Sequence, residues 1–180
     1  PSLLFDRARR TPGRIAMRHK ELGVWRDVTW AAYAENVRHF AAGLIARGFE
    51  KGECLAIASE NRPEWVYADL AAMCAGGLAA GVYATNSAEQ CGYIVRHAGV
   101  RFYVAENLEQ YDKALACKGD APSLEKIIVI DTEGMTRCTD PLYLSFETLV
   151  QEGREFCARL PGVVDDRRAS GWVLQRLGEG

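Results

Sequence analysis

The stretch CLAIASENRPEWVYADLAAMCAGGLAAGVYA, residues 54–84, decides the fold because two kinds of apolar pattern follow each other within it. Residues 54–59 form a short apolar run, which is typical of a strand buried in a parallel sheet. Asn61 then occupies the place of a helix cap, and Pro63 suits the first turn of the helix that follows. A Gly-Gly pair ends this helix before a second apolar run that reaches Val82. The stretch therefore predicts a strand, a helix and a second strand.

The ten residues GVYATNSAEQ, at positions 81–90, show the change from the second strand to a further helix. Val82 and Tyr83 favour an extended chain, whereas Ser87 followed by Gln90 is a capping box that opens a helix. Sheets with alternating strands and helices place ligands outside the carboxyl ends of their strands. This junction is therefore where a ligand site is expected.

The N-terminal part of the chain predicts a β-hairpin and a long helix. Residues 14–30 alternate in polarity around a turn at Glu21–Gly23. Thr29 can cap the amphipathic helix that follows, and Gly48 is a natural stop.

The C-terminal part continues the alternation as far as Asp131 and then weakens. Strands are predicted at 100–106 and 126–131, and Asn107 repeats the capping pattern between them. Beyond Asp131 only a helix start at Ser145 is visible. The whole pattern predicts an α/β fold, a three-layer domain in which a mainly parallel sheet is flanked by helices and preceded by a β-hairpin.

One segment has two interpretations. Residues 65–84 are apolar except for Asp69 and contain a G-x-x-x-G spacing at Gly77 and Gly81, so their length would just cross a bilayer core. Asp69 is costly in lipid, however, and the Gly-Gly pair favours a break. We therefore favour a buried helix followed by a buried strand.

Composition excludes some classes of partner and indicates a compartment. The 24 acidic residues outnumber the 22 basic ones, so nucleic acid is not expected as a partner. The six cysteines are scattered without a C-x-x-C pair, which indicates reduced thiols and no zinc site. The N-terminus, PSLLFDRARR, matches neither a signal peptide nor a membrane anchor, so we expect a cytoplasmic protein.

The residues alone nominate no catalytic set and no metal site. The sequence has no G-x-x-x-x-G-K-[ST] phosphate loop, no H-E-x-x-H and no G-x-S-x-G. The three histidines suit surface or capping roles better than catalysis. Four aromatic residues are candidates for the lining of an apolar cavity, although core packing explains them equally well: Trp65, Tyr67, Tyr83 and Tyr93.

Residues 11–106, and within them ENRPEW and GVYATNSAEQ, resemble the N-terminal part of AMP-forming acyl-CoA synthetases, and most closely the long-chain fatty-acid CoA ligases. The resemblance extends to about residue 150. It implies part of the N-terminal domain of a larger adenylate-forming enzyme, which activates a fatty acid with ATP and Mg²⁺ and transfers the acyl group to coenzyme A. Peripheral contact with a membrane is compatible with this assignment.

The family's catalytic motifs lie later in its chains and have no counterpart in this sequence. The end, VVDDRRASGWVLQRLGEG, departs from the expected approach to a Y-T-S-G-T-T-G phosphate loop. We therefore divide the chain into a partial synthetase domain at 1–160 and an atypical tail at 161–180. The tail is either a foreign sequence on a truncated chain or the result of a frameshift, and a native short paralogue is the alternative.

The resemblance carries no catalytic residue over to this chain. It makes Tyr83 and Asn86 candidates for the wall of the substrate cavity, against the plainer roles of strand packing and turn formation. Two other functions stay open. One is a related adenylating enzyme for a different carboxylate, and the other is a catalytically inactive α/β module that binds acyl chains or a protein.

Overall fold

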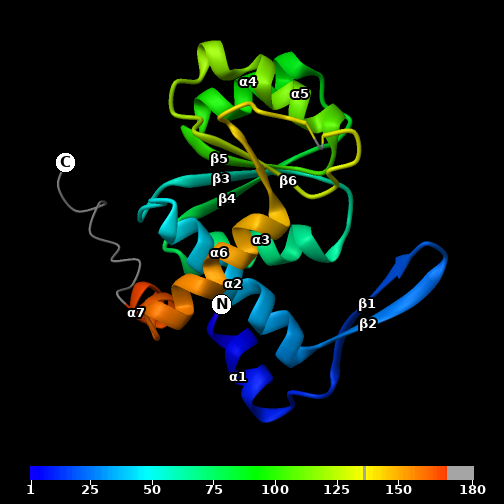
Figure 1. The fold of residues 1–180 in the computed structure, drawn as a ribbon, viewed down its shortest axis with the longest axis vertical. Coiled ribbons are helices and arrows are strands. Elements are labelled where there is room, and N and C mark those ends of the chain that lie inside the picture. The colour runs from blue at the N-terminus through cyan, green and yellow to red at the C-terminus, as the bar shows by residue number, and fades with distance from the viewer. Residues whose placement is uncertain (136, 170–180) are drawn as a thin grey trace.

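A parallel sheet of five strands lies at the centre of the computed structural model, which describes residues 1–135 and 137–169 (Figure 1). The spatial order β4-β3-β5-β6-β7 confirms the predicted α/β class. The strands are β3 (Cys54–Ala58), β4 (Leu78–Val82), β5 (Val100–Ala105), β6 (Lys126–Val129) and β7 (Tyr143–Ser145). The prediction that the strand ending at Val82 is buried was wrong. That strand, β4, forms an edge of the sheet, and Leu78 is 45% exposed.

Five helices cover one face of the sheet, below it in Figure 1. They are α1 (Ser2–Arg10), α2 (Trp30–Ala46), α3 (Pro63–Cys74), α6 (Phe146–Arg159) and α7 (Val163–Ala169). Their apolar sides enclose Leu55, Ile57 and Phe102, which project from alternate positions of the strands.

The opposite face is covered by two helices and a short helical turn. These are α4 (Ala88–His97), α5 (Leu108–Ala116) and the 3₁₀ turn η1 (Lys118–Asp120). The intervening strand positions, among them Ala56, Tyr103 and Ile127, pack against them. Because both faces are covered, β3 is buried along its whole length, as its unbroken apolar run predicted.

Helices α2 and α6 cross at very short range through two glycines. A Cβ added to Gly153 would overlap the carbonyl oxygen of His39 and lie 2.6 Å from the backbone nitrogen of Gly43. A Cβ added to Gly43 would lie 2.9 Å from Cγ of Leu149. Beside the crossing, the rings of Phe40 and Phe146 pack with centroids 4.7 Å apart. Only glycine at both positions permits this approach.

The predicted β-hairpin is confirmed as β1 (Ile15–Glu21) paired antiparallel with β2 (Val24–Thr29). Its two turn residues both have positive φ, +47° at Leu22 and +83° at Gly23. The hairpin extends from the body of the molecule beside α2 (Figure 1).

Four of the predicted helix caps are confirmed, since the side chain of each accepts a hydrogen bond from a backbone N–H in the first turn: Thr29, Ser87, Asn107 and Ser145. The prediction for Asn61 was wrong. Pro63 takes the first helical position, where its missing N–H costs nothing, and this places the cap at Arg62.

The structure contains elements that the sequence did not indicate, namely α1, β7 and α7. Helix α7 lies within the predicted tail and contributes the buried Val164 to the core. Residues 170–180 lie outside the described residues, so the division at residue 160 stays a prediction.

Within the described ranges no helix is long and apolar enough to cross a membrane. Residues 65–84 belong to α3 and β4, which agrees with the interpretation of this segment as a helix followed by a strand.

Candidate functional site

The candidate site follows from the directions in which the strands continue. The loop after β3 leads to α3 on one face of the sheet, whereas the loops after β4 and β5 lead to α4 and α5 on the other face. Neighbouring loops that diverge in this way leave a crevice at the carboxyl ends of their strands. Crevices are therefore expected on both sides of β3.

The crevice between β3 and β5 is occupied by an ionic network. The guanidinium of Arg62 donates to Glu64 at 2.7 Å and to Glu106 at 3.5 Å. The backbone N–H of Glu60 donates to the Glu106 carboxylate at 2.7 Å. Burial lowers the pKa of Arg62, but its bonds to Glu64 and Glu106 outweigh burial and hold that pKa above its ordinary value. This network ties the two loops together.

The crevice between β3 and β4 is open and forms a hollow of about 520 Å³. We call it the edge hollow. Its lining comes from two loops, the end of β4 and the first turn of α3: Ser59, Glu60, Asn61, Trp65, Gly81, Val82, Tyr83, Ala84 and Thr85. Tyr83 is 80% exposed at its rim. A Cβ added to Gly81 would lie 3.6 Å from the indole of Trp65, so the strand closely approaches this ring.

The loop on the β4 side of the edge hollow is held by α5. The side chains of Gln110 and Lys113 both donate to the carbonyl oxygen of Ala84, at 3.0 Å and 2.9 Å. The N–H of Asn86 donates to the carbonyl of Tyr83 at 2.9 Å and closes a turn. The capping box at Ser87 then fixes the start of α4. The backbone behind Tyr83 is therefore anchored although its side chain is exposed.

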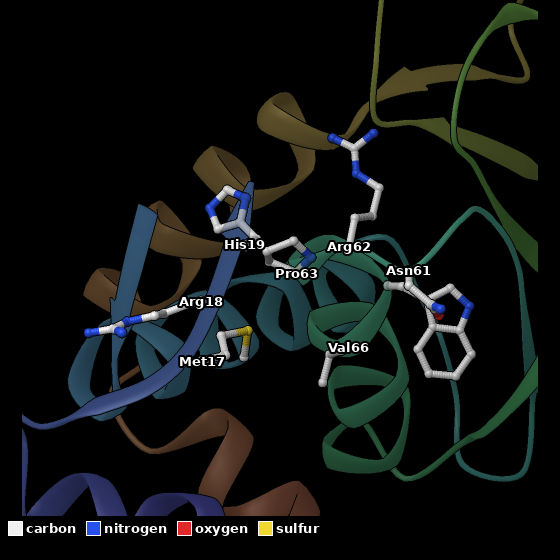
Figure 2. Close-up of a pocket in the computed structure, with 8 residues that line it drawn as sticks. Met17, Arg18, His19, Asn61, Arg62, Pro63 and Val66 are labelled. Carbon is white, nitrogen blue, oxygen red and sulfur yellow. The ribbon is translucent and has the colours of Figure 1, made fainter. Parts of the chain in front are cut away.

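A second and smaller hollow, of about 180 Å³, adjoins the edge hollow. Figure 2 shows that it lies between β1 and the start of α3, with Met17 and His19 on one side and Pro63 and Val66 on the other. Asn61 and Trp65 line both hollows, so they separate the two spaces.

The structure divides the predicted aromatic candidates. Trp65 and Tyr83 line the edge hollow. Tyr67 is buried in the core against Tyr33, with ring centroids 5.6 Å apart, and Tyr93 stacks on His97 on the surface of α4. Burial raises the pKa of Tyr67 to about 12, as expected for a packed phenol.

The two candidate wall residues have different positions. Tyr83 borders the edge hollow, whereas Asn86 is not among its lining residues and takes part in the turn through its backbone. Whether either residue contacts a substrate stays a prediction.

The chemistry of the edge hollow suits binding and not catalysis. It offers hydroxyl groups from Ser59, Tyr83 and Thr85, one carboxylate from Glu60 and one amide from Asn61. No histidine, cysteine or lysine lines it, and the Ser59 hydroxyl donates to the backbone carbonyl of Glu60 at 3.0 Å and not to a side-chain base. Within residues 1–135 and 137–169 no cluster of three histidine, cysteine or acidic side chains is placed to hold a metal ion.

Sequence reasoning missed several lining residues, notably Ser59, Glu60 and Thr85. Each follows a strand, which is the signal that could have found them. That signal becomes specific only once β3 and β4 are known to be neighbours with diverging loops.

Comparison with known proteins assigns the chain to a family. The AMP-binding enzyme family matches residues 4–148, which include every residue that lines the edge hollow. The chain belongs to this family. The acyl-CoA synthetase resemblance found in the sequence is thereby confirmed.

The curated relatives of this AMP-binding family member include long-chain fatty-acid–CoA ligases. This chain is 36% identical over 129 residues to the ligase ACSBG2 of Mus musculus, and the alignment covers 72% of this chain and 19% of that protein. It is 29% identical over 133 residues to FadD15 of Mycobacterium bovis, covering 74% of this chain and 22% of that protein. The chain thus spans about a fifth of the length of these relatives.

Solved structures of two ligases share the fold. Coronafacic acid ligase from Pectobacterium brasiliense aligns with a TM-score of 0.73 at 16% identity, over 83% of this chain and 29% of that one. The anthranilate CoA ligase AuaEII, solved with anthranoyl-AMP, aligns with a TM-score of 0.70 at 21% identity, over 83% of this chain and 26% of that one. These likenesses confirm the fold, a parallel sheet covered by helices.

Proposed function

We propose that this chain is part of an ATP-dependent long-chain fatty-acid–CoA ligase and supplies scaffold and one wall of its substrate cavity. The observation that carries the proposal is the family match, which covers the edge hollow and whose curated relatives are named as ligases of this class. The enzyme would adenylate a fatty acid with ATP and Mg²⁺, release pyrophosphate and pass the acyl group to coenzyme A.

The edge hollow does not fit the triphosphate of ATP. Charge developing on a phosphate during adenylation needs cations or a row of backbone N–H groups. The hollow contains the Glu60 carboxylate and no lysine or arginine, and the nearby guanidinium of Arg62 is paired with Glu64 and Glu106. We therefore assign ATP, Mg²⁺ and coenzyme A to other parts of a longer enzyme and no catalytic residue to this chain.

A reducing compartment such as the cytoplasm suits this function. The six cysteines are all free thiols, and four of them are buried. Burial raises the pKa of Cys54 and Cys117 above the ordinary thiol value, which makes these groups unreactive.

Fatty-acid-dependent exchange of pyrophosphate into ATP tests whether adenylation requires parts of the enzyme beyond this chain. We expect no exchange from the 180-residue chain. If sequencing the source gene past codon 168 reveals a phosphate loop in any frame, we expect its longer product to catalyse exchange with palmitate. Exchange by the short chain would overturn the assignment of catalysis elsewhere. A longer product that prefers benzoate-like or short acids to palmitate would overturn the long-chain assignment.

A second candidate function is an inactive acyl-binding module, which the exposed aromatic wall of the edge hollow favours. Calorimetric titration of the chain with a fatty acid distinguishes it from an inert scaffold. If the hollow binds acyl chains, Tyr83→Ala weakens binding, while Tyr93→Ala, which removes a tyrosine 62% exposed on α4, leaves it unchanged. Equal effects of the two substitutions would exclude the edge hollow as the binding site.

A further inference from the structure

We propose that the tip of the β1–β2 hairpin, defined as residues 20–26, docks on the surface of an anionic lipid bilayer. The inference goes beyond the proposed ligase function and does not depend on it. It rests on three features of the hairpin: an apolar tip without a partner in the described structure, a costly turn residue at its end, and a separation of charge along the chain.

The apolar tip consists of Leu22, Val24 and Trp25, which are 100%, 55% and 65% exposed. Val24 pairs with Glu21 and Trp25 with Lys20, so the two β2 side chains lie on opposite faces of the ribbon, with Leu22 between them at the turn. An apolar patch on one face would suit a flat protein partner. Apolar side chains on both faces and at the end suit insertion into a soft medium.

Leu22 is costly in its position. It has φ +47° and is followed by Gly23 at +83°, which is the two-residue hairpin turn that favours asparagine or glycine at its first position. A leucine in the left-handed region is strained, and this one is fully exposed, so no burial within the described protein offsets the strain. Stability of the hairpin alone therefore does not explain a leucine here.

Charge is distributed unevenly along the chain in a way that complements anionic lipid. Residues 1–29 contain seven basic and three acidic residues, a net charge of +4, whereas residues 30–180 contain fifteen basic and twenty-one acidic residues, a net charge of −6. Basic residues attract a protein to the negative surface of a membrane. The acidic remainder is repelled by the same surface, which favours an approach through residues 1–29.

The spacing of charge along the hairpin matches the depth of a bilayer interface. Both acidic residues at the hairpin are paired, Glu21 with Arg26 at 3.1 Å and Asp27 with Arg18 at 2.7 Å. Lys20 has no ion-pair partner among the described residues and lies two positions from Leu22, which is about 7 Å along a strand. Apolar groups of interfacial segments enter roughly 5–10 Å, so an inserted Leu22 would place Lys20 among the lipid phosphates.

The decisive variant is Leu22→Asn, because it separates binding from folding. Asparagine is favoured at positive φ, so the variant should unfold at the same or a higher temperature than the original chain. Binding to vesicles of mixed phosphatidylserine and phosphatidylcholine, measured by co-sedimentation, should nevertheless be weakened about tenfold or more, because the leucine that inserts into the lipid is lost. The control is Leu160→Asn, which removes a leucine 51% exposed after α6 and should leave binding unchanged.

Two further measurements define the contact. Lys20→Gln should weaken binding about fivefold at low ionic strength and have less effect as salt is raised. Lipids brominated in their acyl chains should quench part of the tryptophan fluorescence, and Trp25→Phe should abolish that part.

The proposal is overturned if the original chain does not sediment with anionic vesicles at low salt, or if Leu22→Asn binds them equally well. It is also overturned if the hairpin mediates association with a second copy or another protein and not with lipid.

Discussion

The close crossing of α2 and α6 predicts that Gly153→Ala destabilises the protein, although alanine is the better helix former. An added Cβ would lie 2.6 Å from the Gly43 nitrogen and 2.8 Å from the His39 carbonyl carbon. These are backbone atoms, so no side-chain rotation relieves the clash. Ordinary contact requires the helices to separate by more than about 0.8 Å, because the His39 carbonyl oxygen is closer still, and this forfeits a large part of the dispersion energy between them.

The magnitude follows from two opposing effects. Overpacking of a tight core costs about 1–3 kcal/mol, and the upper end applies because backbone meets backbone. Alanine recovers about 1 kcal/mol in helix propensity. The net loss is therefore about 2 kcal/mol, which lowers the melting temperature by roughly 4–8 °C for a chain of this size.

Thermal unfolding followed by circular dichroism measures this loss. The matched control is Gly119→Ala, because a Cβ at Gly119 meets nothing within 4 Å and this glycine lies in a helical turn without positive φ. We expect the control to change stability by less than about 0.5 kcal/mol. A Gly153→Ala chain as stable as the control, or more stable, would refute the argument that the crossing requires glycine.

Three further predictions concern a cap, an ion pair and a buried phenol. Ser87→Ala removes the capping box of α4 and should cost about 1 kcal/mol in urea unfolding, and an unchanged midpoint would contradict it. The hydrogen bond from Arg38 lowers the pKa of Asp165 from its ordinary 3.8, so the stabilisation is present above pH 3.8 and lost as pH falls through the lower folded value. Asp165→Asn should therefore reduce the acid sensitivity of unfolding, and the same pH profile in both chains would count against this. Burial raises the pKa of Tyr33 from 10.0 to about 12, so its stabilisation is lost as pH rises from 10 toward 12. Tyr33→Phe should remove a late step from the ultraviolet absorbance titration, and loss of a step near pH 10 instead would show that the phenol is not perturbed.

The sequence predicted those elements whose local residue pattern alone reflects their position in the fold. Strand β3 is apolar throughout because helices cover both its faces, and a capping box at Ser87 opens α4 whatever surrounds it. Strand β7 was missed because it has only three residues, and α7 because Val164 is its single buried residue. Such short elements form through contact with the rest of the fold, which no local pattern records.

The candidate site was predicted less fully than the fold. Tyr83 was identified as an aromatic candidate and through the family resemblance, and the structure places it at the edge hollow. Ser59 and Thr85 line the same hollow only because β4 pairs with one side of β3 and β5 with the other. This order of strands depends on which helices cover each face of the sheet, and the sequences of β4 and β5 do not determine it.

The pairing of α2 with α6 also sets an order of events during synthesis on the ribosome. Strands β3, β4 and β5 can associate once residue 105 has emerged, because their connections are short. Helix α2 is made before all of them, yet the helix that crosses it at Gly43 begins only at Phe146. About a hundred residues must therefore be added while the side of α2 around Phe40 stays uncovered, which makes this face the natural binding place for a chaperone on the growing chain.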